Sequence, residues 1–364
     1  MFCSQCVLPD NYPNIEFDTQ GVCNFCRSYK KKTYLGAEAL EMELKTRLKR
    51  NKLDTCVVPV SGGKDSTYVL YYLTKVLGFK TIAVNYDNGF THPQATENLR
   101  QITERLKVEL FIIRGTRQKK LMMGNLRSFL SRPSAAMVPL MCTGCRFGIV
   151  SGACKVARER NINLFVIGWS GIEDTPFKSY FLTADGGSEI KGLAKNLVQN
   201  PRYLLHGGAL TQALDYYHNY SHVCDWGPAL RTLYPGIRPI SFFDYIEYNP
   251  EHIQQVVADE AGWSCPSPET FWQFDCQIKL IQNSLYSTLV GFTAYNDYLS
   301  TRIREGYITQ EYALELLKKQ KERAASEHDH VRTVLFKNGT EKLVSRFEEF
   351  VQYQPLSKVA TQRK

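Results

Sequence analysis

The residues from Ser61 to Ser66 combine glycines, hydroxyls, a lysine and a carboxylate, a set of groups that could bind phosphate. They directly follow the β-branched run 56–60, and a helical pattern begins at once. Gly62 and Gly63 let the backbone approach phosphate closely, successive N–H groups form an anion-binding nest, and the helix start adds its positive end. The run therefore predicts a phosphate-binding loop.

Each polar side chain of this run has an expected task. Lys64 is placed to offset phosphate charge, and the Ser61 and Ser66 hydroxyls can donate hydrogen bonds. Asp65 could hold Mg²⁺ on a leaving pyrophosphate. The run lacks the longer spacing between glycine and Gly-Lys of the Walker loop, so a different class of nucleotide site is expected.

Two cysteine pairs lie near the N-terminus, Cys3 with Cys6 and Cys23 with Cys26. Their spacing matches two knuckles that close one tetrahedral Zn²⁺ site. Four thiolates leave no open coordination position, so this zinc would be structural. The alternative, reduced core cysteines, does not explain paired spacing in a segment too short for a core.

A third pair, Cys142 and Cys145, precedes a predicted helix. Three interpretations remain open for it: an iron–sulfur cluster, a second zinc site, or unligated thiols. Cys56 and Cys154 fall in a predicted strand and a predicted helix, where apolar packing is expected.

Alternating strand and helix signals predict the scaffold that must position these groups. Strands of this kind, linked by helices of ten to fifteen residues, indicate an α/β fold with a parallel, doubly wound sheet covered on both faces. Ligands of such sheets bind at the carboxyl ends of the strands. The expected strands are 55–60, 81–86, 108–113 and 163–167, and the expected helices are 66–77, 93–107 and 146–160.

Changes in composition divide the chain into five expected parts. They are a zinc-knuckle module (1–35), a linker helix (36–53), an ATP-binding domain (54–180), a loop-rich aromatic substrate region (181–250) and a helical C-terminal region (251–364), the last with helices at 251–261, 270–286 and 309–327.

The run 61–66 resembles the SGGxDS signature of the PP-loop ATP pyrophosphatases, which cleave ATP between the α and β phosphates and adenylate an oxygen of their substrate. The resemblance implies a HUP-like sheet, ATP and Mg²⁺ as cofactors, adenine beside the ends of neighbouring strands, and an acidic loop near the metal. The candidate nucleotide-binding residues are Ser61, Gly62, Gly63, Lys64, Asp65, Ser66, Val84, Asn85, Tyr86 and Gly168, and the candidate catalytic residues are Lys64, Asp65 and Asp174.

The text around the N-terminal cysteines, over 3–10, 13–18 and 21–26, looks like the opening of the N-acetyl sugar amidotransferases of surface-polysaccharide biosynthesis. The resemblance continues through 58–66 and 85–89, returns at 262–263 and 300–309, and is weak over 115–235. It implies that an acetamido oxygen on a nucleotide-linked or lipid-linked sugar is adenylated. Ammonia from a separate glutaminase subunit would then displace AMP.

The pair Cys142 and Cys145 departs from that family and is similar to the Cys-x-x-Cys of PP-loop tRNA thiolases. Those enzymes hold an iron–sulfur cluster with the pair and one later cysteine near a Cys-Pro. Cys265 occupies that kind of position, and Cys276 and Cys224 are competing third ligands. The alternative function is therefore ATP-dependent sulfur transfer to a nucleoside, tRNA or small metabolite, with a [4Fe-4S] cluster and a cysteine desulfurase as donor partner.

The charge balance suits a phosphate-bearing partner. The chain has 45 Lys and Arg against 36 Asp and Glu, a formal net charge of +9, which favours a nucleotide, a nucleotide-linked sugar or RNA. Neither a secretory signal nor a membrane span is expected from the apolar runs, so a cytoplasmic location follows. The oligomeric state stays open, with a homodimer as one candidate.

Overall fold

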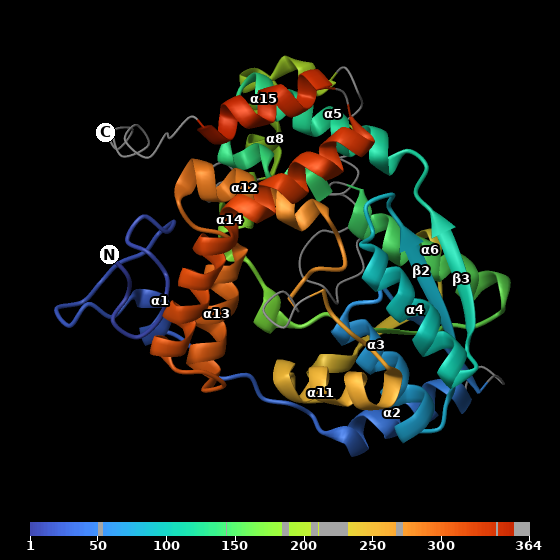
Figure 1. Cartoon of the computed structure of the whole chain (residues 1–364). Coiled ribbons are helices and arrows are strands. Elements are labelled where there is room, and N and C mark those ends of the chain that lie inside the picture. The colour runs from blue at the N-terminus through green and yellow to red at the C-terminus, as the bar shows by residue number, and fades with distance from the viewer. Residues whose placement is uncertain are drawn as a thin grey trace.

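A computed structural model gives the arrangement of the chain (Figure 1). It describes residues 1–49, 54–142, 144–183, 189–204, 210, 232–266, 272–339 and 341–352. Cys224 lies outside these ranges.

A parallel sheet confirms the predicted fold class. Its described strands are β1 (Thr55–Pro59), β2 (Lys80–Asp87), β3 (Glu109–Arg114), β4 (Leu164–Ile167) and β5 (Arg238–Ser241). They lie in the order β3-β2-β1-β4-β5, and each neighbouring pair is parallel. The winding reverses between β1 and β4, which is where α/β sheets bind ligands.

Helices cover both faces of the sheet (Figure 1). Side chains alternate along β1, so Val57 packs toward α6 while Val58 packs in the opposite cluster. Helices α2 (Ala37–Lys49), α3 (Lys64–Tyr71), α4 (Pro93–Leu106) and α11 (Pro250–Ala261) contribute to this opposite cluster, together with α13 (Ala294–Glu305) and α14 (Gln310–Asn338). The far face is covered by α6 (Cys145–Glu159).

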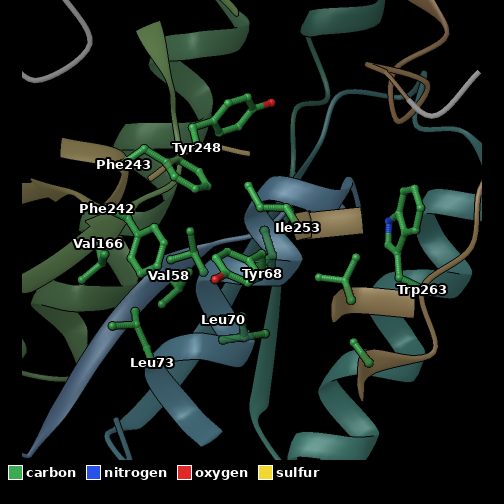
Figure 2. Close-up of a cluster of buried hydrophobic side chains, with 14 of the residues drawn as sticks. Val58, Tyr68, Leu70, Leu73, Val166, Phe242, Phe243, Tyr248, Ile253 and Trp263 are labelled. Carbon is green, nitrogen blue, oxygen red and sulfur yellow. The ribbon is translucent and has the colours of Figure 1, made fainter. Parts of the chain in front are cut away.

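Figure 2 shows how β1 and α3 share the larger cluster. Val58, Tyr68 and Leu70 are buried together with Phe242 and Phe243. A π-helical turn, Tyr72–Val76, follows α3 and adds Leu73 to the same cluster. This packing fixes the start of α3, and therefore the loop before it, against the sheet.

The remaining described helices, together with α13 and α14, form a second mass beside the sheet (Figure 1). They are α1 (Asn24–Arg27), α5 (Gln118–Ser131), α7 (Pro176–Leu182), α8 (Glu189–Gln199), α12 (Ile278–Val290) and α15 (Glu341–Gln352). Short 3-10 turns are η2 (Ala135–Met137), η3 (Pro139–Cys142), η4 (Gly171–Glu173), η5 (Pro201–Leu204) and η6 (Phe242–Asp244).

Several segments differ from the sequence-based expectation, among them α5, α7, α8, α13 and α15, which were not expected. Strand β5 lies within the region expected to be loop-rich, and α14 runs further than 309–327. The helix expected over 270–286 begins only at Ile278. Residues just before it are not helical because Cys276 forms an antiparallel bridge with Thr91.

One described stretch, Ala135–Glu159, is long and apolar enough to cross a membrane by length and composition alone. It consists of two 3-10 turns and α6, and Gly144 between them has the left-handed φ of 82°. Helix α6 packs on β1 and β2, so the apolar composition is accounted for by core packing.

Candidate active site

The loop 61–63 leaves the carboxyl end of β1 and leads into α3. Gly62 has a φ of +85°, and a Cβ atom there would collide with the backbone oxygen of Ala95. The Gly62 oxygen accepts hydrogen bonds from Trp263 Nε1 at 3.0 Å and Asn98 Nδ2 at 3.2 Å. No side chain caps the start of α3, so its N–H groups are available to an anion.

Lys64 lies deeper than the sequence suggested, with 2% of its side chain exposed. Its Nζ is 2.7 Å from Asp65 Oδ1, 2.8 Å from the Tyr248 hydroxyl and 3.8 Å from Glu173 Oε1. Lys64 therefore neutralises the carboxylates of Asp65 and Glu173, and it also lies beside the phosphate-binding loop. Burial raises the pKa of Asp65 to about 7, although Lys64 acts in the opposite direction.

Glu173, and not the predicted Asp174, is the acid that faces Lys64. Its Oε1 accepts hydrogen bonds from Trp272 Nε1 at 2.8 Å and from the Tyr248 hydroxyl at 2.9 Å. Asp174 is exposed at the end of the turn η4. The two acids are neighbours in sequence, but the turn directs only Glu173 toward Lys64.

Asp275 is a further acid at the loop. A Cβ atom on Gly63 would lie 3.3 Å from its Oδ2. Burial raises the pKa of Asp275. Its backbone is fixed by the hydrogen bond from His92 N to Asp275 O, 2.9 Å long.

The residues predicted to contact adenine lie at the end of β2, but their side chains have structural partners. Val84 is buried in the cluster beneath α6, and Asn85 Nδ2 donates to Val60 O at 2.7 Å. The Tyr86 ring fills the space beside Gly115 and Gly148, where Cβ atoms would collide with it. Gly168, at the end of β4, lies against Val69 of α3.

Cys276 lies near the second cysteine pair. Asn88 Nδ2 lies 3.3 Å from Cys145 Sγ and 3.4 Å from Cys276 Sγ. Burial raises the pKa of the Cys276 thiol to about 11, and the nearby Cys142 acts in the same direction. Cys265 instead packs against the cluster around β1 and α3.

The spacing of these thiols bears on what they could hold. A single Zn²⁺ ion with bonds of about 2.3 Å brings its thiolates to roughly 4 Å from one another. Within the described ranges, only the N-terminal cysteines meet a limit of 4.8 Å. Cys142, Cys145 and Cys276 do not form such a compact group among the described residues.

The N-terminal cysteines form one compact group as predicted. The Sγ atoms of Cys3, Cys6, Cys23 and Cys26 all lie within 4.8 Å of one another. Arg304 of α13 donates from Nε to Cys26 Sγ at 3.3 Å and from its terminal nitrogen to Cys6 Sγ at 3.4 Å. The group can hold one tetrahedral metal ion.

Four residues of the site were absent from the sequence prediction: Tyr248, Glu173, Trp272 and Asp275. Each comes from a segment without a recognisable spacing. Among these segments, the run 272–276 is the one whose sequence could have indicated a functional site, because Trp272, Asp275 and Cys276 lie close together in it.

Comparison with known proteins adds little to this geometry. No family model matches the sequence, and no curated protein matches it. Among solved structures, the chain is similar to the U34-tRNA thiolase NcsA from Methanococcus maripaludis with its [4Fe-4S] cluster. The alignment covers 86% of this chain and 88% of that chain, with 17% identity and a TM-score of 0.31, values that carry no argument about function.

Proposed function

We propose that this protein is an ATP-dependent enzyme that adenylates an oxygen of its substrate and releases pyrophosphate. The observation that carries the proposal is the uncapped start of α3 behind the loop 61–63, at the reversal point of the sheet. Phosphate groups bind at such helix starts. The acids beside the loop, Asp65 and Glu173, supply oxygen ligands of the type that Mg²⁺ prefers.

The residues of the chain have separate tasks in this reaction. A substrate oxygen attacks the α-phosphorus, the bond to the bridging oxygen breaks, and pyrophosphate leaves with that electron pair. The N–H groups at the start of α3 hold the phosphates, and Lys64 keeps Asp65 and Glu173 together for the cation. Bound Mg²⁺ would offset the charge that develops on the leaving pyrophosphate.

Replacing Lys64 by alanine tests this assignment. The change leaves two buried carboxylates without their cation, so we expect pyrophosphate release to fall by roughly a hundredfold or more. Lys75→Ala, an exposed lysine that follows α3, is the matched control. Pyrophosphate formation at the native rate in Lys64→Ala would contradict the proposal.

The second step replaces the adenylated oxygen, which leaves as part of AMP. Sulfur transfer is favoured by the three thiols of Cys142, Cys145 and Cys276, because these residues suit a [4Fe-4S] cluster that would carry sulfide on its open iron. The acceptor would then be a nucleoside, RNA or small metabolite, and the donor a cysteine desulfurase.

Nitrogen transfer is the second candidate, favoured by the resemblance of 3–26 and 300–309 to sugar amidotransferases. The acceptor would be a nucleotide-linked or lipid-linked sugar, and a glutaminase subunit would supply ammonia. Anaerobic purification separates the two candidates. Sulfur transfer predicts a brown, iron-containing protein whose turnover is abolished by Cys142→Ala, whereas nitrogen transfer predicts a colourless protein indifferent to that change.

We further propose that the N-terminal cysteines bind structural Zn²⁺ and that the enzyme acts in the cytoplasm. Four thiolates close the coordination sphere, so the ion takes no part in the reaction. Metal analysis of the purified chain tests the first point: one zinc per chain is expected, lost in Cys23→Ser.

A further inference from the structure

The positive charge of the chain is concentrated in one segment. Residues 110–158 contain nine Lys and Arg and no Asp or Glu. In the rest of the chain Lys and Arg equal the 36 Asp and Glu in number, so the excess of +9 belongs to this segment alone. All nine basic side chains are exposed: Arg114, Arg117, Lys119, Lys120, Arg127, Arg132, Arg146, Lys155 and Arg158. A cluster of this kind is the electrostatic mark of a surface that binds a polyanion.

Four of these cations lie together in the basic turn (114–120), where β3 leads into α5 at the edge of the sheet (Figure 1). They are Arg114 at the end of β3, Arg117 just before α5, and Lys119 and Lys120 in the first turn of α5. The acid nearest to them in sequence, Glu109, pairs with Arg160 instead, at 2.6 Å. Within the described ranges, none of the four cations forms an ion pair, so their charge is available to a partner.

The basic turn adjoins the carboxyl end of β2, close to the second cysteine pair. A Cβ atom on Gly89 would lie 3.6 Å from Lys119 Cβ. The residue before Gly89 is Asn88, whose Nδ2 lies 3.3 Å from Cys145 Sγ and 3.4 Å from Cys276 Sγ. The turn therefore borders the edge of the sheet at which these thiols lie.

The four cations are placed to contact successive phosphates and not a single one. They come from a strand end, a turn and a helix, and consecutive residues of an α-helix point about 100° apart. A nucleic-acid backbone presents one phosphate per nucleotide, and exposed Lys and Arg are the side chains that most often contact it. A small nucleotide offers too few phosphates to engage all four.

Two other polyanionic partners fit the turn less well. An acidic protein surface binds through buried aromatic or apolar anchors, and a membrane surface is entered by the apolar side chains of an amphipathic helix. Of the large apolar side chains in 109–120, only Ile112 is exposed. The observations therefore favour a nucleic acid, and RNA is the nucleic acid among the candidate acceptors.

We propose that the basic turn binds the phosphate backbone of an RNA that carries the acceptor oxygen. This inference rests on the proposed function and names the substrate class of its site. Because the turn adjoins Asn88, an RNA held there lies at the edge of the sheet that carries the phosphate loop and the cysteine pair.

Neutralising the turn tests the proposal. The variant combines Arg114→Gln, Arg117→Gln, Lys119→Gln and Lys120→Gln in the full chain, and its affinity for unmodified tRNA is measured over a range of salt concentrations. Removing four phosphate contacts should lower the affinity at low salt by roughly a hundredfold and reduce the slope of log affinity against log salt by about three. Binding of a non-hydrolysable ATP analogue should not change.

Two variants serve as controls. Arg114→Lys combined with Arg117→Lys keeps the charge and should keep the native salt dependence. The second control removes the same charge from exposed lysines away from the turn: Lys75→Gln, Lys321→Gln, Lys337→Gln and Lys342→Gln. Because salt screens charges that lie away from the contact, the affinity of this control for tRNA should fall by less than roughly threefold.

The basic turn is not an RNA surface if tRNA binds the neutralised variant as tightly as the native chain, or if the native chain does not bind tRNA at low salt. Tighter binding of polyglutamate or of phosphatidylglycerol vesicles than of tRNA, lost in the neutralised variant, would assign the turn to an acidic protein or to a membrane instead. If the native chain fails to bind the ATP analogue, the proposed function itself fails, whatever the result with tRNA.

Discussion

The Glu173 carboxylate is held through one oxygen only. Trp272 Nε1 and the Tyr248 hydroxyl both donate to Oε1, so the second oxygen is available to a cation. Trp272 is itself stacked on Tyr298, with ring centres 4.6 Å apart. Trp272 therefore positions Glu173 and contacts no reacting atom.

Trp272→Phe separates this positioning role from simple packing. The phenyl ring keeps part of the stack but lacks the N–H donor. We therefore expect weaker Mg²⁺ binding, seen as a roughly tenfold higher Mg²⁺ concentration for half-maximal pyrophosphate release. Tyr298→Phe is the control, because the Tyr298 hydroxyl is buried without a hydrogen-bond partner. An unchanged Mg²⁺ requirement in Trp272→Phe would rule out the positioning role.

The third thiol of the second cysteine set gives another residue-scale prediction. We expect Cys276→Ala to abolish iron binding on anaerobic reconstitution, because Cys276 shares Asn88 with Cys145. Cys265→Ala should retain iron, since Cys265 packs in the other cluster. Iron content and visible absorption decide the point, and the reverse pattern would restore the ligand inferred from the sequence.

At this scale, the sequence predicts groups that are contiguous in the chain. The spacing within 61–66 predicts a phosphate-binding loop, and the spacing of the cysteine pairs predicts metal sites. Glu173, Tyr248 and Trp272 meet only after folding, and no spacing links them. The sequence does not show which of the two neighbouring acids, Glu173 or Asp174, faces Lys64, because this depends on the conformation of the turn η4.

The loop between β1 and α3 depends on a glycine for two separate reasons. Gly62 has a left-handed φ, and its α-hydrogen faces the Ala95 backbone. Gly78 also has a left-handed φ, of +70°, but a Cβ atom there would meet nothing within 4 Å. Substitutions at Gly62 and Gly78 therefore separate the cost of the left-handed backbone, which both share, from the cost of the contact with Ala95, which only Gly62 of these two makes.

We expect Gly78→Ala to lower the free energy of unfolding by about 1–2 kcal/mol, the cost of the left-handed conformation. Gly62→Ala should lower it further and abolish binding of an ATP analogue, because α4 must move away from the loop. Urea unfolding and calorimetry measure the two effects. Equal losses of stability in both variants would show that the contact with Ala95 is unimportant.

Helix α13 joins the N-terminal module to the ATP site. Asn296 Nδ2 donates to Val7 O at 3.1 Å, and Val7 N donates to Ser300 Oγ at 3.2 Å. On another side of the helix, Tyr298 stacks on Trp272. Helix α13 could not be predicted from a hydrophobic period, because its apolar positions serve two contacts and follow no single stripe. Its end signals are clear, since Thr293 and Asn296 form a capping box and Gly306 ends the helix.

For the molecule as a whole, the parallel direction of β1 to β4 and the doubly wound class of their sheet could be predicted, because strand and helix signals alternate along the sequence. Strand β5 and the run 272–276 could not, since their partners are distant in sequence. Because α13 contacts both Val7 of the N-terminal module and Trp272 of the ATP site, we expect loss of a metal from the module to affect the ATP site.

Cys23→Ser should therefore destabilise the whole chain and not only its first residues. Because a structural metal supplies folding free energy and its module packs on α13, we expect the midpoint of thermal unfolding to fall by roughly 5 °C or more, with slower pyrophosphate release. Ser28→Ala, an exposed change within the module that spares its cysteines, is the control. A single unfolding transition at the native midpoint in Cys23→Ser would show that the module is energetically independent.

The position of α13 also has a consequence for synthesis on the ribosome. The N-terminal module emerges well before the residues that receive it, Asn296 to Gln310. A segment this short cannot bury enough apolar surface to stay folded alone. Binding of a metal ion by the four thiols would let the N-terminal module fold before α13 has been synthesised. In cells that lack the metal, we expect nascent chains whose N-terminal module is unfolded.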